Sequence, residues 1–80
     1  MERKDIYEKL NEIFIDILDL DECNLTDETS ANDIEEWDSL SHIQLIVAIE
    51  KEFKIKFTSM EIMKWNNVGE MVNSMEEKIK

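Results

Sequence analysis

The sequence predicts an all-α fold, a small four-helix bundle of three main helices and one short helix with a long loop between the first two. Apolar residues recur at steps of three and four in several stretches, which is the spacing of one helix face. The 80 residues contain one glycine and no proline, too few turn formers for a hairpin-rich β fold. The hydrophobic share of 42% suffices for a packed core, and the length predicts one domain over residues 1–80.

The first predicted helix covers residues 2–18. Its apolar positions form one stripe, and charged residues such as Lys4 and Glu8 fall on the opposite side. The stripe consists of Ile6, Leu10, Ile13, Phe14, Ile17 and Leu18.

Residues 19–37 lack helical periodicity and are rich in Asp, Glu, Thr, Ser and Asn, which bond locally to the backbone and favour turns. A loop of this length is uncommon in a compact domain and indicates either a function or a wrong assignment of the elements. We expect an ordered loop, attached to the core by Leu20, Leu25, Ile34 and Trp37.

The second main helix is predicted over residues 39–53. Asp38 suits its N-cap, because a carboxylate there accepts a backbone N–H at the positive end of the helix dipole. Leu40 and Val47 extend the apolar surface beyond a strict stripe. The expected buried side consists of Ile43, Leu45, Ile46, Ile49 and Phe53.

Residues 54–57 read as an extended connector that leads into the short helix. Thr58 and Glu61 have capping-box spacing, and Asn67 and Glu70 repeat that spacing before the last helix. Methionines supply much of the remaining apolar surface. We expect a core position for Met60, Met63, Met71 and Met75.

Charge and composition exclude several classes of function. Nine basic residues against twenty acidic ones give a formal net charge of −11, which argues against a nucleic-acid partner and an anionic membrane surface. The acidic balance suits basic patches on other proteins. Cys23 is the only cysteine and His42 the only histidine, so we expect no disulfide and no metal site. Without a signal-like or membrane-spanning stretch, we expect a cytoplasmic protein with no membrane insertion.

Ser39 lies where the acidic loop gives way to the second helix. A hydrolase would need a base, an orienting group and oxyanion donors around it. His42 and Asp38 are near in sequence, but the helix fixes their directions and no glycine-rich turn offers an oxyanion hole. We therefore predict no catalytic residue and no enzyme, and a solvated position for His42.

Two other interpretations of Ser39 remain. The serine can simply help to start the helix, as serine often does. Alternatively, its hydroxyl is held out for another enzyme to modify. A phosphodiester there would benefit from the free N–H groups and the dipole of the helix start.

The stretch "WDSLSHIQLIVAIEKEF", residues 37–53, resembles the central motif and second helix of acyl carrier proteins. In that family an Asp-Ser-Leu motif precedes a helix of this pattern. The resemblance covers nearly the whole chain. It includes a loop of the "LTDETSANDI" kind, the later "FKIKF", and "NNVGEMV" before the last helix.

This resemblance implies that a phosphopantetheinyl transferase moves the 4′-phosphopantetheine arm of coenzyme A onto Ser39. The thiol of the arm would hold an acyl or related group as a thioester. A monomeric carrier would then present that group to acyl-loading and acyl-processing enzymes that have basic docking patches. The expected docking residues are Asp38, Leu40, Val47 and Glu50.

The chain departs from the fatty-acid carriers in informative places. Glu36 and Trp37 stand where glycine is usual, and Ser41 and Gln44 stand where acids are typical. We interpret these departures as signs of a specialised pathway, such as polyketide, mixed peptide or polysaccharide-decorating synthesis, rather than general fatty acid synthesis. The alternative is a carrier-like docking module that is never modified.

Overall fold

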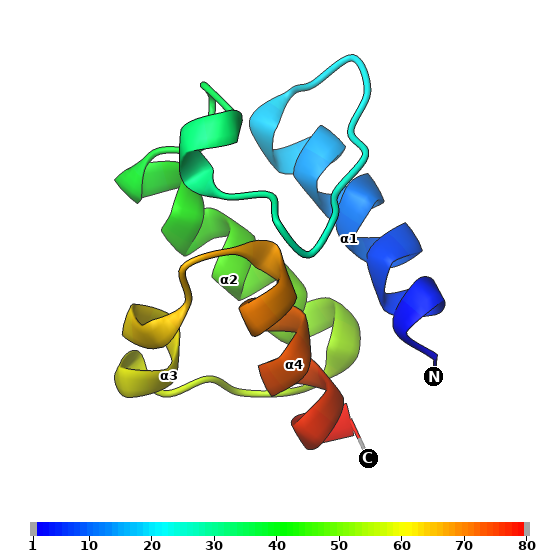
Figure 1. The fold of residues 1–80 in the computed structure, drawn as a ribbon, viewed down its shortest axis with the longest axis vertical. Coiled ribbons are helices and arrows are strands. Elements are labelled where there is room, and N and C mark those ends of the chain that lie inside the picture. The colour runs from blue at the N-terminus through cyan, green and yellow to red at the C-terminus, as the bar shows by residue number, and fades with distance from the viewer. Residues whose placement is uncertain (1, 80) are drawn as a thin grey trace.

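The computed structural model describes residues 2–79 and contains four α-helices (Figure 1). Within residues 2–79 there is no strand, and the predicted all-α fold with one short helix is confirmed. The elements are α1 (Arg3–Leu18), the 3₁₀ turn η1 (Ala31–Asp33), α2 (Ser39–Phe53), α3 (Ser59–Lys64) and α4 (Val68–Ile79).

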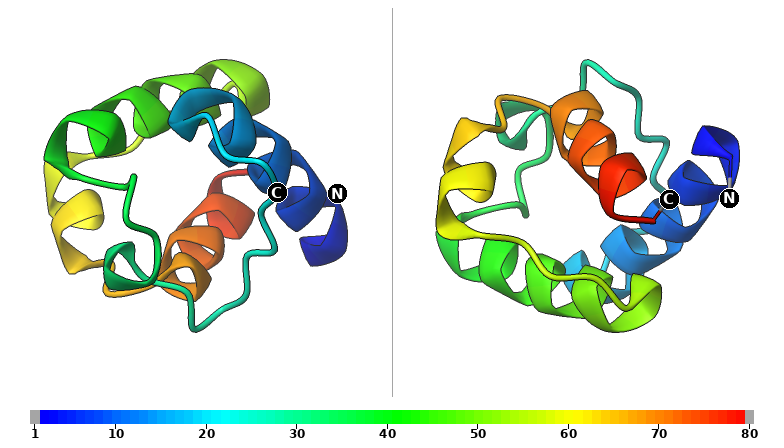
Figure 2. Two further views of the ribbon diagram at one scale, coloured as in Figure 1. Left: turned by 90° about the horizontal axis from the view of Figure 1, so that it is seen from above. Right: turned by 90° about the horizontal axis from the view of Figure 1, so that it is seen from below.

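The long loop joins α1 to α2 around one end of the bundle, and α4 lies across the space that the other elements surround (Figures 1 and 2). Helix α1 contacts both α2 and α4, and α3 contacts α4. Two backbone bonds join the loop to the start of α4. The N–H of Val68 donates to the Thr29 carbonyl at 2.8 Å, and the N–H of Gly69 donates to the Asp27 carbonyl at 3.0 Å.

One face of each main helix supplies the core. Phe14 of α1 is fully buried and meets the ring of Trp37 edge-on, with 5.0 Å between the ring centroids. The loop is attached to this core as predicted, because Leu25 and Trp37 are buried in it and Leu20 and Ile34 are partly buried and pack against it. The other fully buried side chains include Ile6, Leu10, Leu45, Ile49, Val68, Val72 and Met75.

Three apolar residues that we expected in the core lie on the surface instead. Ile43 is 62% exposed, Met60 70% and Met63 83%. Ile43 belongs to a second stripe of α2, which faces away from the buried one. The two methionines lie on the outer side of the short helix α3, whereas Met71 and Met75 of α4 are buried as predicted.

Capping hydrogen bonds and left-handed residues define where the helices start and stop. The predicted capping box of α3 is confirmed, because Thr58 Oγ1 accepts from the Glu61 N–H at 3.2 Å and Glu61 Oε1 accepts from the Thr58 N–H at 2.9 Å. Asn67 Oδ1 likewise accepts from the N–H of Glu70 at 2.9 Å. Helices α1 and α2 end on Asp19 (φ 55°) and Lys54 (φ 57°), both in the left-handed region that favours glycine.

A network of hydrogen bonds and ion pairs joins the loop to α1 and to α4. The guanidinium of Arg3 donates to Asp27 Oδ1 at 2.8 Å and to Asn73 Oδ1 at 2.9 Å, and it also pairs with Glu76. The Tyr7 hydroxyl donates to the same Asp27 carboxylate. Burial, together with this hydrogen bond, raises the pKa of Tyr7 to about 12. The loop is thereby held at a fixed place, and with it the segment that leads to Ser39.

Candidate functional site

Ser39 is the first residue of α2, and its side chain is exposed. The neighbouring Asp38 carboxylate accepts two hydrogen bonds from Ser41. Its Oδ1 accepts from the Ser41 N–H and from the Ser41 hydroxyl, both at 2.9 Å. These bonds cap α2 as predicted and lower the pKa of Asp38. The helix therefore presents the Ser39 hydroxyl to solvent at its first turn.

His42 lies one turn further along α2 and is half-buried, so the prediction of a solvated side chain is wrong. The indole N–H of Trp37 donates to His42 Nδ1 at 3.0 Å, and the two rings are stacked with 5.8 Å between their centroids. Burial lowers the pKa of His42, which favours the neutral ring. Since Asp38 is bonded to Ser41 and His42 Nδ1 to Trp37, the three residues do not form a Ser-His-Asp triad.

A groove of about 360 Å³ lies beside Ser39. The end of the loop and the start of α2 form one side, with Trp37 and His42 in the wall. The opposite side comes from the link between α3 and α4, where Trp65, Asn66 and Asn67 lie. Sequence reasoning missed this groove, because its two sides are more than twenty residues apart and only the packing of the bundle brings them together.

The four predicted docking residues have different surroundings. Leu40 is 69% exposed and Val47 46%, as we expected of contact residues. Asp38 is exposed but bonded to Ser41. Glu50 is half-buried, and its Oε2 accepts from the N–H of Phe57 at 2.9 Å, which holds the connector between α2 and α3.

The exposed apolar side chains of α2 and α3 were only partly found from the sequence. Leu40, Ile43 and Val47 follow one another at steps of three and four, so they occupy one face of α2. Met60 and Met63 have the same spacing on α3. The signal for Ile43 was present, since it continues the Leu40–Val47 stripe and not the Leu45–Ile49 one. We name the five side chains the apolar face: Leu40, Ile43, Val47, Met60 and Met63.

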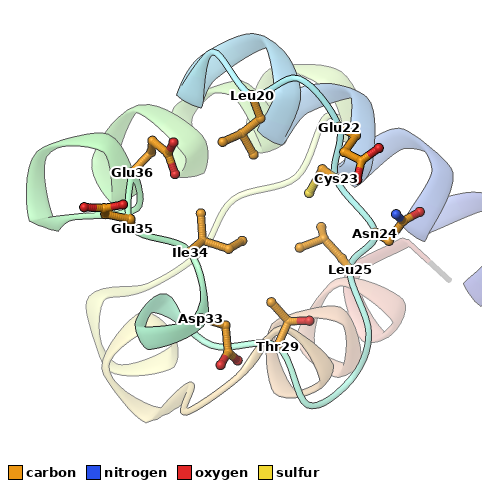
Figure 3. A pocket seen from close by; sticks show the side chains of 10 residues that line it. All are labelled: Leu20, Glu22, Cys23, Asn24, Leu25, Thr29, Asp33, Ile34, Glu35 and Glu36. Atoms are coloured by element: carbon orange, nitrogen blue, oxygen red, sulfur yellow. The ribbon is translucent and has the colours of Figure 1, made fainter.

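A second hollow, of about 460 Å³, lies inside the curve of the loop (Figure 3). The side chains of Leu20, Leu25, Ile34 and Cys23 point toward its middle. Burial raises the pKa of the Cys23 thiol, so the unreactive protonated form dominates at neutral pH. Within residues 2–79 no group of His, Cys, Asp and Glu side chains is placed to hold a metal ion, and no helix has the length and apolar character needed to cross a membrane.

Comparison with known proteins places this geometry in a family. Residues 8–75 match the family model described as a phosphopantetheine attachment site. An acyl carrier protein of Petrotoga mobilis is 34% identical over 79 residues, which cover 99% of this chain and 93% of the relative. An acyl carrier protein of Clostridium acetobutylicum is 37% identical over 68 residues, which cover 85% of this chain and 88% of the relative.

A solved structure agrees with the sequence relatives. The solution NMR structure of a holo acyl carrier protein from Geobacter metallireducens superposes with a TM-score of 0.86 at 46% sequence identity. The match covers 91% of this chain and 84% of that one. The chain belongs to the acyl carrier protein family.

A member of this family is a carrier and not a catalyst. It holds acyl groups on a covalently attached 4′-phosphopantetheine arm, whose thiol forms a thioester with the carried group. The described residues fit such an arm. The start of α2 offers an exposed hydroxyl at the positive end of the helix dipole, which favours a phosphate, and the groove lies directly alongside.

Proposed function

We propose that Ser39 carries the 4′-phosphopantetheine arm of this acyl carrier protein. The observation that supports the proposal is the position of its hydroxyl, exposed at the first turn of α2 and next to an Asp38 carboxylate that is bonded to Ser41. Attachment requires only that a partner enzyme reaches this hydroxyl, since the carrier itself supplies no base. The positive end of the α2 dipole then stabilises the negative phosphodiester.

The test is the intact mass of the protein after incubation with coenzyme A and a permissive phosphopantetheinyl transferase. We expect the mass of one phosphopantetheine to be added to the native chain and to Ser59→Ala, but not to Ser39→Ala. Ser59 is a matched control, because it is an exposed serine at the first position of another helix, α3. Modification of Ser39→Ala, or no gain on the native chain with several transferases, would overturn the assignment.

We further propose that partner enzymes dock on the apolar face and on the adjoining Asp38. The face begins directly after Ser39 and extends over α2 and α3. Residues 38–65 carry four acidic and four basic side chains, so this part is electrically neutral although the chain has a net charge of −11. Partners with a charge-poor apolar surface therefore suit it better than strongly basic ones. The carboxylate of Glu50 is bonded to the connector and contributes little to such docking.

If partners dock on the apolar face, substitutions there should lower the activity of a partner enzyme without changing the stability of the carrier. Val47→Glu and Met63→Glu should leave the free energy of unfolding nearly unchanged, because both side chains are exposed. Both should lower kcat/KM of a partner enzyme that acts on the loaded carrier. Asn24→Glu, at an exposed position in the loop, serves as the control with the same change in net charge. Equal kcat/KM values for all three variants and the native chain would place the docking surface elsewhere.

The same neutral face supports a specialised pathway, such as polyketide, mixed peptide or polysaccharide-decorating synthesis. Ser41 and Gln44 stand on the first two turns of α2, where fatty-acid carriers typically have acids. A general fatty-acid ketosynthase and its reductases should therefore use this loaded carrier more slowly than their own. Equal kcat/KM values for the two carriers would contradict the specialised role and favour general fatty acid synthesis.

A further inference from the structure

The hollow inside the curve of the loop, which we name the loop hollow, has an apolar middle that is still accessible. The loop segments 20–25 and 29–36 form its two sides. Leu20, Cys23 and Ile34 point toward the middle of the loop hollow but are only partly buried (Figure 3). Accessible apolar surface inside a cavity is a place where a group of another molecule can bind.

Every charged side chain that lines the loop hollow is acidic. Glu22 lies on one side, and Glu35 and Glu36 lie on the opposite side (Figure 3). These three carboxylates are exposed, and within residues 2–79 none of them takes part in an ion pair. The fourth acid, Asp33, accepts a hydrogen bond from the N–H of Ser30 at 2.9 Å and so holds the loop itself. The loop hollow therefore combines an apolar middle with unpaired negative charge at its edge.

Contacts with the helices hold both sides of the loop hollow in place. On one side the N–H of Leu25 donates to Asn11 Oδ1 of α1 at 2.9 Å. On the other side the N–H of Trp37 donates to the Ile34 carbonyl at 3.1 Å, and the Trp37 ring is buried against Phe14. Because the loop hollow is formed before anything enters it, less entropy is lost on binding.

An arginine side chain matches both parts of the loop hollow. Its aliphatic stem covers apolar surface, while its guanidinium stays at the edge and forms paired hydrogen bonds with a carboxylate. Glu36 lies three residues before Ser39 in the sequence, and Leu40 of the apolar face follows Ser39 directly. A partner that reaches the Ser39 hydroxyl is therefore close to the loop hollow on one side and to the apolar face on the other.

We propose that the loop hollow binds an arginine side chain of the enzymes that act on Ser39 or on the arm attached to it. The stem of the arginine lies against Leu20 and Ile34, and its guanidinium pairs with Glu35 and Glu36. Charge recognition is thereby placed on the loop before Ser39, whereas α2 and α3 supply the apolar contact. This inference deepens the proposed function and rests on the attachment at Ser39 for the identity of the partners.

The test uses two tripeptides with blocked ends as probes, leucine-arginine-leucine and the same peptide with citrulline in place of arginine. Citrulline has the shape of arginine without its charge. We expect the arginine peptide to bind the apo protein about fivefold more tightly than the citrulline peptide. NMR titration measures both Kd values, and nuclear Overhauser effects from the arginine methylene protons to the methyl groups of Leu20 and Ile34 locate the stem.

Matched double variants test where the charge is recognised. Glu35→Gln combined with Glu36→Gln should remove the preference for the arginine peptide, because both carboxylates at the end of the loop are lost. Glu8→Gln combined with Glu77→Gln removes the same amount of charge from exposed positions on α1 and α4, and it should keep the preference. All four substitutions are at exposed positions, so both variants should fold.

The outcomes separate this inference from the attachment at Ser39, because the peptide titration needs no arm. Equal Kd values for the two peptides would mean that the loop hollow takes an apolar group regardless of charge, and would overturn the arginine site. An equal loss of preference in the two double variants would assign the attraction to net charge and would also overturn it. If the preference persists but Ser39 accepts no arm, the attachment and the identity of the partners are overturned, and arginine binding stands.

Discussion

Helix α1 and its loop carry charge very differently from helices α2 and α3. Residues 1–37 contain thirteen acidic and three basic side chains, a formal net charge of −10, whereas residues 38–65 are neutral. In residues 2–79 the large apolar side chains that lie exposed all belong to the neutral part. Charge is therefore gathered on α1 and its loop, and the region that follows Ser39 keeps an exposed apolar surface.

The two regions also differ in the contacts that they make with the rest of the protein. The acidic loop is fastened by polar bonds, through Arg3 and Asp27 to α4 and through Gly69 to the Asp27 carbonyl. The outward side of α2 and α3 has no such covering among the described residues. Phe14 and Met63 represent the two situations, one fully buried in α1 and one 83% exposed on α3.

The largest expected effect is the truncation of Phe14. Phe14→Ala should lower the free energy of unfolding by about 3–5 kcal/mol, because it removes a buried ring that also supports Trp37. Met63→Ala should change it by less than about 0.5 kcal/mol. Urea denaturation followed by circular dichroism measures both. A loss for Met63→Ala comparable to that for Phe14→Ala would mean that the apolar face packs against something in the folded monomer.

The next effect concerns the contact between the loop and α4. A Cβ on Gly69 would lie 2.8 Å from the Asp27 carbonyl oxygen and 3.0 Å from its Cα, so backbone has to move. Gly69→Ala should cost about 1–3 kcal/mol by overpacking. Glu77→Ala, an exposed change on the same helix, is the control and should cost under about 0.5 kcal/mol. Equal urea midpoints for the two variants would show that the loop shifts away at little cost.

Repulsion among the acidic side chains of residues 1–37 should lower the thermal stability at low salt. Added salt or magnesium should raise Tm by several degrees, roughly 1 kcal/mol at this size, by screening the like charges. Glu22→Gln should raise Tm at low salt by more than Lys51→Gln lowers it, because Glu22 lies among acids and Lys51 in the neutral part. Shifts of equal size would show that only the net charge matters and not its distribution.

The smallest effect concerns the pH dependence at His42, in the neutral part. Burial lowers its pKa in the folded state, so the unfolded chain binds the proton more readily. Stability should therefore fall as pH drops below the ordinary histidine value of about 6.5. His42→Asn removes the titration while keeping an acceptor for Trp37, and it should flatten the stability between pH of about 7 and 5. An unchanged slope in this variant would assign the pH dependence to carboxylates.

Local rules predicted the elements of this fold well. The α2 boundaries follow from Asp38 at the N-cap, and α3 from the Thr58–Glu61 box, because each bond joins residues three apart. Helix α1 starts one residue later than predicted. The residues that attach the loop to the core were also recognisable, because they are apolar residues spaced through a polar segment.

The sequence pattern did not predict which distant parts of the chain pack together. Met60 and Met63 were expected in the core because they are apolar, but apolar type does not fix burial on a helix of six residues. The pairing of Arg3 with Glu76 and the groove between Ser39 and Asn67 join distant parts of the chain. The position of Ser39 was predicted from local sequence, whereas its surroundings came only from the assembled bundle.

The ends of the two long helices have a consequence for how this chain can change over evolutionary time. Asp19 and Lys54 hold left-handed backbone without being glycine, at a steric cost of roughly 1 kcal/mol each. Glycine at either position would remove that cost at a site away from Ser39 and from the apolar face. The fold therefore retains a margin from which destabilising changes on α2 and α3 can be compensated. Those helices carry the surface on which we propose that partner enzymes dock.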